Sequence, residues 1–509
     1  MAIALVPVVL GILYLRDEMA REGRLGFPVD DAYIHFQFAR NLATGHGFAF
    51  NPGEPSAGAT SPLWVVLLAA GRVMGLPIEW VAVVLGLASA ALAAVLAFEV
   101  GLAAGLPPAL GVLAGLALGT VGRFTWASIS GMEPCLATAL ALLVLRLALS
   151  PARTIARGAW MGAAAGLAAE TRPELLLLGG LVGMAEVSRV LGGPRGRPDT
   201  HGPLVRWAPV LVYAAVLALV VLPYVGFCLA TTGRPLPNTY YVKSVIAARL
   251  RPDLLAQRRE VYFRDMGVWL WRDNPATALL ALPGAVLWLA RRRPRGSALV
   301  ALWPPCYWAY AWVASPLHFN LSRYTMPLMP CVALVAMAPL EAVLAWRGTP
   351  VFRRLATAVA TALTLVPALA RQTQYHEVFL GNVDNILRMQ VTMGEWVRDR
   401  LPAGARVATN DIGAITWYGG RYCIDLEGLV SSDLVTVMLG RLGDPSFTHP
   451  DDVLLDYLPR HAVSYCILFP EWHPALARAP WLERVHEIDY PNTTGGGNAL
   501  VAYRVVGSP

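Results

Sequence analysis

The sequence has little charge and almost no lysine. Only 15% of its 509 residues are charged, against about a quarter in soluble proteins, while 56% are hydrophobic and the mean hydropathy is +0.50. This excludes an ordinary soluble protein and indicates a polytopic membrane protein. Lys243 is the only lysine among the 41 basic residues. That exception favours a specific task, such as contact with a lipid phosphate, over the alternative of a snorkelling interfacial lysine.

Cysteine is also scarce, and this excludes a disulfide framework or a cysteine-based metal site. Six cysteines are scattered without metal-ligand spacing. Only Cys423 and Cys466 share the C-terminal part, where we favour two buried thiols over one disulfide. The same part has no nucleotide fingerprint, phosphate loop or nucleophile elbow.

Acidic residues are few in the first 369 residues, which hold 30 basic and 18 acidic side chains, whereas the remainder holds 11 and 16. The basic excess lies in short connections between apolar runs, as is typical of loops that stay cytoplasmic. It therefore orients the membrane part, and no nucleic-acid partner is expected. The clusters are Arg153/Arg157, Arg189/Arg195/Arg197/Arg206, Arg291/Arg292/Arg293/Arg295 and Arg347/Arg353/Arg354.

Apolar runs of membrane-spanning length follow one another through this part. They lie near 1–15, 78–98, 107–124, 132–149, 207–229, 275–290, 297–313, 325–345 and 352–369. Two half-length runs between 158 and 187 flank a polar tip, and the arginine clusters on both sides predict a hairpin that crosses out and back. We read the first run as an anchor and not a removed signal. The sequence thus predicts about eleven transmembrane helices with the N-terminus inside.

This topology places the polar segments on the outer face of the membrane. They are the first external loop at 16–62, the segment 126–133, the hairpin tip, the loops 231–274 and 315–324, and residues 370–509. An outward-facing cavity is where charged groups at membrane depth can be satisfied. We therefore expect a transmembrane module over 1–369 and a soluble extracytoplasmic domain over 370–509, whose length suits one domain.

The C-terminal part alternates between strand and helix patterns, which predicts an α/β domain. The candidate strands are Arg406 to Thr409, Tyr422 to Asp425, Ser464 to Phe469 and Ala499 to Val505, and the candidate helices are Gln390 to Arg400 and Pro450 to Leu458. Acids at the ends of such strands often line a ligand crevice, so Asp411 is a candidate substrate contact. The domain is expected to bind the acceptor or to serve as a structural cap.

Asp30 and Asp31 form an acid pair at the head of the polar first loop. One acid could cap the helix that starts at Ala32. A cap needs only one, and two carboxylates that face a cavity indicate a general base or a metal ligand. A divalent cation therefore stays open as a cofactor, and no second acidic cluster demands one.

Other polar residues in the external segments are candidates for substrate binding, each with a structural alternative. Arg172 faces an anionic donor or pairs with Glu170 and Glu174, and His46 is a ligand or a turn residue. The candidates for the donor phosphate are Lys243, Arg172, Arg323, Tyr324 and Arg234, with Arg323 beside Pro316, His318 and Asn320. The candidates for other substrate contacts are Glu54, Glu133, Glu174, His46, Asn238, Tyr240 and Asp411.

Several blocks of sequence resemble the polyprenyl-phosphate-dependent membrane glycosyltransferases of the GT-C fold, and most closely bacterial arabinofuranosyltransferase-like members. The most specific block comprises Asp30, Asp31, Ala32, Tyr33 and Ile34, then Arg40, Asn41, Leu42, Gly45, His46, Gly47, Asn51, Pro52, Gly53, Glu54, Ser61, Pro62, Leu63 and Trp64. Further matches are Ser130–Glu133, Thr171–Glu174, Pro235–Thr239 and Asn410–Ala414.

The resemblance implies a GT-C membrane module and a polyprenyl-phosphate-linked sugar as donor, with a pentose such as arabinofuranose as one candidate. It implies transfer to a glycan, lipid or protein acceptor on the outer face of the bacterial cytoplasmic membrane, with an aspartate of the first loop as base. Of the two acids, Asp30 is our expectation. Direct attack would invert the anomeric carbon. A transporter or lipid-linked sugar flippase, and a non-catalytic envelope protein that binds polysaccharide, are the alternatives.

Overall fold

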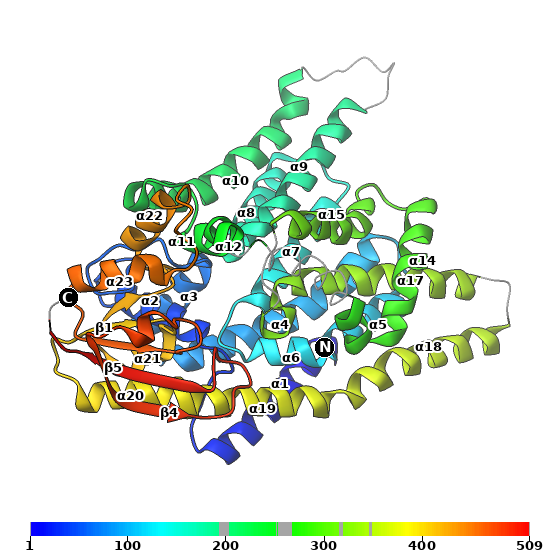
Figure 1. Ribbon diagram of the computed structural model, residues 1–509. Coiled ribbons are helices and arrows are strands. Elements are labelled where there is room, and N and C mark those ends of the chain that lie inside the picture. Colours follow the sequence, from blue (N-terminus) through cyan, green and yellow to red (C-terminus); the bar gives the residue numbers. More distant parts are fainter. Residues whose placement is uncertain are drawn as a thin grey trace.

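The protein is mostly helical with one small sheet in its C-terminal part (Figure 1). The computed structural model describes residues 2–192, 203–250, 252, 267–314, 319–345 and 349–507. Each apolar run of the sequence coincides with a described helix, and the run at 158–187 is a helical hairpin as predicted. Arg195, Arg197, Arg347, Pro316 and His318 lie outside the described residues.

The first part of the chain is a bundle of helices with short connections. Its helices are α1 (Ala2–Glu22), α2 (Asp31–Ala43), α3 (Pro62–Val73), α4 (Ile78–Ala103), α5 (Pro108–Gly119), α6 (Gly122–Ser128), α7 (Pro134–Ala148), α8 (Ile155–Thr171), η1 (Pro173–Leu175), α9 (Leu176–Leu191), α10 (Pro203–Thr232), α11 (Asn238–Tyr240), η2 (Tyr241–Ile246), α12 (Ala247–Leu250), α14 (Pro275–Ala290), α15 (Ala298–Ala314), α16 (Phe319–Ser322), η3 (Arg323–Leu328), α17 (Met329–Ala345) and α18 (Pro350–Ala370). A proline begins α3, α5 and α7, where the missing N–H costs no intrahelical hydrogen bond.

Helix α8 packs tightly on α10 because its contact face carries glycine at every fourth position. A Cβ atom at Gly158 would lie 2.3 Å from the carbonyl oxygen of Pro209, and one at Gly162 would lie 2.5 Å from that of Tyr213. Small residues at this spacing let the backbones of membrane helices approach closely. The ends of α9 and α10 project together from the body of the molecule (Figure 1).

Within the described residues, four helices are long and apolar enough to cross a membrane. They are α4, the segment 205–232 of α10, the segment 323–345 and the segment 350–400. Counting α5 and α6 as one span bent by 63° makes five. The eleven spans remain a prediction. Two of the other predicted runs, 132–149 and 275–290, form the shorter apolar helices α7 and α14.

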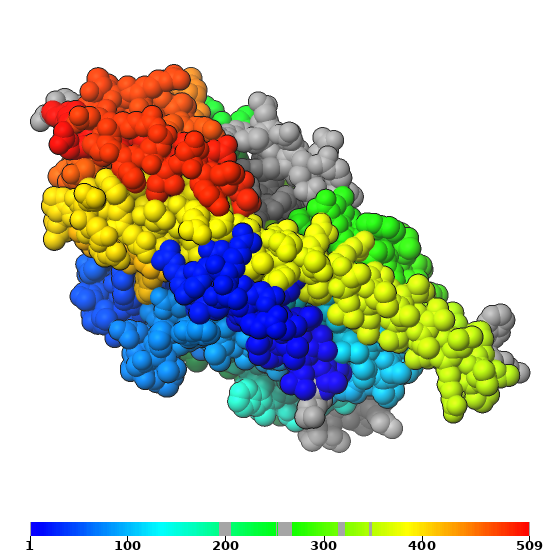
Figure 2. All heavy atoms as spheres, turned by 90° about the horizontal axis from the view of Figure 1, so that it is seen from below, coloured from blue at the N-terminus to red at the C-terminus, as the bar shows by residue number. Residues whose placement is uncertain are grey.

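The last apolar helix continues without a break into the C-terminal part. Helix α18 leads into α19 (Gln372–Ile386), the π-helical η4 (Leu387–Val391) and α20 (Thr392–Arg400), so the expected domain boundary after residue 369 falls inside one continuous helix. Helix α1 lies across α19 (Figure 2), and the Tyr14 hydroxyl donates to the carbonyl oxygen of Gln372 at 2.7 Å. The N-terminal helix therefore braces the connection between the two parts.

The C-terminal part is an α/β unit around a five-stranded sheet with the order β2-β1-β3-β5-β4. Strands β1 to β3 are parallel, and β5 runs antiparallel between β3 and β4. The remaining elements are β1 (Arg406–Thr409), α21 (Gly413–Gly419), β2 (Tyr422–Asp425), α22 (Ser432–Gly440), α23 (Asp451–Arg460), β3 (Tyr465–Leu468), η5 (Leu476–Arg478), β4 (Leu482–Asp489) and β5 (Ala499–Val505).

Four strands lie where the sequence predicts them, whereas β4 was missed. Strand β4 is at the sheet edge and its side chains are mostly exposed, so it lacks the apolar alternation that marks a half-buried strand. Cys423 on β2 and Cys466 on β3 are buried free thiols separated by β1, which confirms the preference for thiols over a disulfide.

The segment 16–62, which the sequence predicts to be the first external loop, packs between the helical bundle and the C-terminal sheet. The Asn51 side chain donates to the carbonyl oxygen of Cys423 at 2.8 Å and accepts from its backbone N–H at 2.9 Å, so its amide pairs with strand β2 as a backbone would. The Ser56 hydroxyl donates to the carbonyl oxygen of Val430 at 2.9 Å. These contacts dock the C-terminal part on the loop that carries the acid pair.

Asn51→Ala is expected to loosen this docking, because it leaves both backbone groups of Cys423 without their partner. The loss should be about 1–3 kcal/mol and should appear as faster hydrogen exchange in β2 and faster proteolysis between the two parts. Thr44→Ala is the matched control, since the Thr44 hydroxyl donates only within its own loop. Equal exchange rates in the Asn51 variant and the control would contradict the docking role.

Candidate functional site

A cavity of about 170 Å³ lies where several separate parts of the chain meet. They include the start of α2, residues 58–61, residues 132–133, the tip of the α8–α9 hairpin, residues 236–244, and the segment that contains Arg323 and Tyr324. We call it the basic cavity, because Lys243, Arg172 and Arg323 all line it. The structure thus brings together four of the five residues proposed from the sequence to bind the donor phosphate.

The hairpin tip supplies Arg172, which is buried and held by two carboxylates. Its guanidinium lies 2.8 Å from Glu133 and 3.1 Å from Glu174, and its Cζ is 4.5 Å from the centre of the Tyr324 ring. The expected partner Glu170 is not among its ion pairs. Glu133 stands just before α7, so this network fixes the guanidinium against the cavity wall.

Arg323 forms the second buried cationic contact and pairs with the Asp31 carboxylate through its Nη2 atom. Its Cζ lies 5.6 Å from the centre of the Tyr324 ring, so the ring has a guanidinium near it on two sides. Lys243 lies in the π-helical segment η2, and such π segments often occur at functional sites. The cavity therefore holds three cations close together, and the carboxylates of Asp31, Glu133 and Glu174 on the same wall balance their charge.

Several buried polar atoms of residues that line the basic cavity have no hydrogen-bond partner. They are Nε2 of His35, Oγ of Ser61, Oε2 of Glu133, Nε of Arg172, Oγ1 of Thr239, and Nε and Nη1 of Arg323. An unsatisfied buried polar group costs about 1–3 kcal/mol, so such groups are rare unless a ligand completes them. The free nitrogens of Arg172 and Arg323 are donors, which fits an anionic, oxygen-rich ligand. Oε2 of Glu133 accepts, as does Nε2 of His35, whose Nδ1 donates to the Asp31 carbonyl oxygen.

A second cavity of about 450 Å³ lies between the helical bundle and the C-terminal domain. It meets the basic cavity at a junction formed by residues that line both, namely Asp31, Ile34, Lys243, Arg323, Tyr324 and Leu429. Its far wall carries Asp411, Glu427, Glu471 and Trp472. We call it the acidic cavity. Ligands bound in the two cavities would meet at Asp31.

The two adjacent acids have different surroundings. Asp30 accepts hydrogen bonds from the backbone N–H groups of Gly413 and Ala414, at 2.7 Å each, and a Cβ at position 413 would lie 2.1 Å from the Asp30 carbonyl oxygen. It lines only the acidic cavity. No side-chain hydrogen bond caps α2, so the capping role expected as an alternative is wrong. Asp30 instead ties the first loop to the start of α21.

The pKa values of the two acids move in opposite directions. Burial, with the nearby Asp411 carboxylate, raises the pKa of Asp30 well above its ordinary value despite the two backbone hydrogen bonds. Burial would also raise the pKa of Asp31, but the charges of Arg323 and Lys243 outweigh it and hold that pKa well below the ordinary value. Asp31 is therefore the more acidic member of the pair.

The wall of the acidic cavity combines Asp411, a candidate from the sequence, with Glu427 and His473, which the sequence did not suggest. Burial raises the pKa of Asp411 to about 6, although Gln390 donates to this carboxylate at 2.7 Å. His473 is buried between two acids, with Nδ1 2.7 Å from Asp451 and Nε2 3.2 Å from Glu427. Burial lowers the pKa of His473, but its two hydrogen-bonded acids raise it to about 9. Only the folded sheet brings these residues together.

Four residues proposed from the sequence lie outside both cavities. Arg234 and Asn238 contact helix α22, where Arg234 donates to the Thr436 hydroxyl at 3.0 Å and Asn238 to the Ser432 hydroxyl at 2.8 Å. Arg234 is therefore a docking contact and does not face the basic cavity. Glu54 accepts from the Tyr422 hydroxyl at 2.6 Å, and His46 is an exposed turn residue.

The other proposed residues line the two cavities. Tyr240 lines the basic cavity beside Glu133 and Glu174, and Asp411 lines the acidic cavity. His35 was missed, although it stands one helical turn after Asp31 and so faces the same way. Among the described residues, no group of three or more His, Cys, Asp or Glu side chains is placed to hold a metal ion.

The stabilising effect of His473 should depend on pH. Because its pKa is raised to about 9 in the folded chain, its contribution is fully present below about pH 6.5 and is lost as the pH rises through 9. We expect wild type to melt about 2–4 °C above His473→Gln at pH 6, with the difference gone by pH 10. His46→Gln, at the exposed turn, is the control. A difference that stays constant over this range would contradict the charged state.

Comparisons with known proteins agree with the fold. Residues 382–503 match a family described as a domain of unknown function (DUF8728). No curated protein matches the chain. Among solved structures, ArnT from Cupriavidus metallidurans bound to undecaprenyl phosphate is 14% identical, with a TM-score of 0.63 and coverage of 99% of this chain and 97% of that one.

A second group of similar structures comes from Archaeoglobus fulgidus. Its oligosaccharyltransferase in the apo form is 12% identical, with a TM-score of 0.61 and coverage of 92% of this chain and 69% of that one. The same organism's oligosaccharyltransferase AglB, in complex with an inhibitory peptide and a dolichol-phosphate, is 11% identical, with a TM-score of 0.58 and coverage of 98% and 74%. The chain thus has the fold of these enzymes, which confirms the GT-C type architecture expected from the sequence.

Proposed function

We propose that the protein is a glycosyltransferase that moves a sugar from a polyprenyl phosphate to an acceptor on the outer face of the bacterial cytoplasmic membrane. The observation that carries the proposal is the junction of the two cavities, where Asp31 lies between a basic, unsatisfied site and a second open site. Two of the structures with this fold hold undecaprenyl phosphate or a dolichol-phosphate, which supports a lipid phosphate as donor.

The basic cavity suits the phosphate of the donor. Arg172 and Arg323 are held rigidly by buried ion pairs, and Lys243 and Tyr324 line the same wall. As the bond between the anomeric carbon and the phosphate oxygen breaks, negative charge grows on the departing polyprenyl phosphate, and fixed cations stabilise it. The lipid phosphate leaves with the electron pair of that bond, so no cofactor is required for the bond change itself.

Asp31 is the better placed of the two acids to act as general base, in place of Asp30 as expected from the sequence. It takes the proton of an acceptor hydroxyl while that oxygen attacks the anomeric carbon opposite the phosphate, which inverts the configuration. In the free protein Arg323 suppresses its basicity. A donor phosphate that engages Arg323 would share this cation and raise the pKa of Asp31, so the base becomes effective when donor is bound.

The acidic cavity suits an acceptor rich in hydroxyl groups, which we propose to be a glycan. Carboxylates of Asp411 and Glu427 accept hydrogen bonds from hydroxyls, and the partly exposed Trp472 offers an aromatic surface for a sugar ring. Three acids on the far wall disfavour a phosphorylated acceptor. The donor sugar follows from the resemblance alone, which favours a pentose such as arabinofuranose. This arrangement needs the C-terminal domain on the extracytoplasmic side.

Asp31→Asn should lower transfer at least about 100-fold because it removes the proton acceptor. Asp30→Asn should act mainly through docking of α21, with a higher KM for the acceptor and a smaller change in kcat. The measurement is release of polyprenyl phosphate from polyprenyl-phosphate sugars by the purified chain in detergent, with a glycan acceptor. Asn51→Ala, which also loosens docking but leaves both acids intact, is the control for Asp30→Asn.

The same assay separates transfer from transport. Full activity of both Asp30→Asn and Asp31→Asn would overturn the proposal. Movement of an intact lipid-linked sugar across liposomes, with no bond cleavage, would instead identify a flippase.

A further inference from the structure

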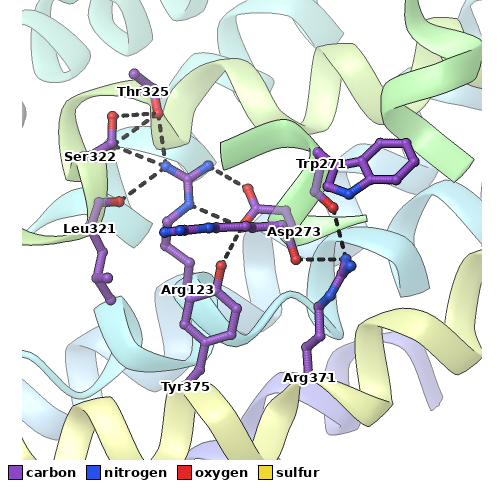
Figure 3. Close-up of polar contacts among 9 residues, drawn as sticks. Arg123, Trp271, Asp273, Leu321, Ser322, Thr325, Arg371 and Tyr375 are labelled. Atoms are coloured by element: carbon purple, nitrogen blue, oxygen red, sulfur yellow. Dashed lines mark hydrogen bonds and ion pairs between the residues drawn. The ribbon is translucent and has the colours of Figure 1, made fainter. Parts of the chain in front are cut away.

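A buried ion pair outside both cavities has no role in the chemistry described above. Arg123 on α6 is 1% exposed, and its Nη2 and Nε atoms lie 2.5 and 3.2 Å from the Asp273 carboxylate. The Tyr375 hydroxyl donates to the same carboxylate at 3.1 Å (Figure 3). Replacing such a pair with apolar residues is often neutral or stabilising. Its presence therefore calls for a reason other than stability.

The remaining guanidinium nitrogen of Arg123 holds one turn of the chain. Nη1 donates to the carbonyl oxygens of Leu321 at 3.1 Å and Ser322 at 3.2 Å, and to the Thr325 hydroxyl at 2.9 Å. Thr325 in turn donates to the Ser322 carbonyl oxygen at 2.9 Å. Figure 3 shows these groups converging on the guanidinium from one side, while Asp273 faces it from the other.

The turn held by Arg123 has a strained backbone. Leu321 has φ 56° and Ser322 has φ 52°, which is the left-handed region that residues with side chains rarely adopt. Such strain persists only where the surroundings hold it, and it occurs often at functional sites. The hydrogen bonds from Arg123 go to the carbonyls of these same two residues.

The strained turn leads directly to the residues at the cavity junction. Arg323 and Tyr324 follow it, and the Tyr307 hydroxyl donates to the Tyr324 carbonyl oxygen at 2.8 Å. The direction in which the chain leaves residue 322 decides whether the Arg323 guanidinium reaches Asp31. Relaxation to a right-handed conformation would turn the following backbone and move that guanidinium.

We propose that Arg123 and Asp273 are positioning residues that hold Leu321 and Ser322 in the left-handed conformation and thereby present Arg323 to the donor phosphate. The proposal rests on the proposed function in so far as Arg323 binds that phosphate. Glycine adopts positive φ at little cost. A glycine at position 322 should therefore replace part of what Arg123 does, whereas alanine, which is strained there like serine, should not.

The test measures binding of a short-chain polyprenyl phosphate to the purified full-length chain by tryptophan fluorescence, together with KM and kcat for the donor. Arg123→Gln should weaken binding about tenfold, equivalent to 1.4 kcal/mol, and raise the donor KM more than it lowers kcat. Adding Ser322→Gly should restore binding to within about threefold of wild type. Adding Ser322→Ala, which also removes the hydroxyl, should restore nothing.

Thr325→Val is a milder variant than Arg123→Gln, because it removes one hydrogen-bond partner of Arg123 at nearly equal side-chain volume. It should show the same rescue by Ser322→Gly. If Arg123→Gln does not accumulate as folded protein, Thr325→Val tests the positioning role in its place. Unchanged binding in both variants, or equal rescue by Ser322→Gly and Ser322→Ala, would overturn the positioning role.

Arg323→Gln distinguishes an error in the positioning role of Arg123 from an error in the assignment of the donor site. If Arg323→Gln weakens binding while the Arg123 and Thr325 variants do not, the donor site stands and the positioning role is wrong. If Arg323→Gln binds the lipid phosphate as wild type does, the assignment of the donor site is wrong.

Discussion

The ion pair between Arg323 and Asp31 is the contact on which the rest of the site depends. It joins the first external loop to a segment almost 300 residues later in the chain, and both residues line the two cavities. In the free protein the two side chains neutralise each other. An anionic ligand that binds Arg323 would weaken this ion pair. In the proposed function, the cation would then serve the phosphate and the carboxylate would serve the acceptor. Donor binding and activation of the base would thereby be the same event.

The first external loop owes its shape to contacts on both of its sides. Its glycines allow many backbone conformations, and its acid pair is polar. Without contacts to other parts of the chain, the loop would not adopt a single conformation. Asn51 pairs with β2, Asp30 ties to the start of α21, and Asp31 is held from the bundle. The loop is therefore positioned by contacts with both the helical bundle and the C-terminal part.

Much of the fold and part of the site could be predicted from the sequence. The apolar runs identified the helices, because burial in lipid or in a helical core demands long apolar segments. Arginine clusters predicted the hairpin that carries Arg172, and the solitary lysine pointed to Lys243. These signals are local in the chain and need no knowledge of contacts.

The remainder depends on contacts between distant segments, which no local pattern encodes. Arg234 and Lys243 are both cations in one loop, yet the first turns to α22 and the second to the cavities. His473 gains its surroundings only when β3 and α23 are assembled. Likewise, the adjacent acids Asp30 and Asp31 look equivalent in sequence, and their difference arises from Arg323 and Gly413.

The helix from residue 350 to residue 400 connects the apolar bundle directly to the C-terminal part. Because no flexible linker interrupts it, a tilt of its apolar half is transmitted to the sheet at its other end. The helix has a turn at Arg371 and a π-helical stretch at Leu387–Val391, and Gln390 in that stretch holds Asp411. A change in bilayer thickness or tension that tilts the apolar half of this helix would thus shift Gln390 and Asp411 at the wall of the acidic cavity.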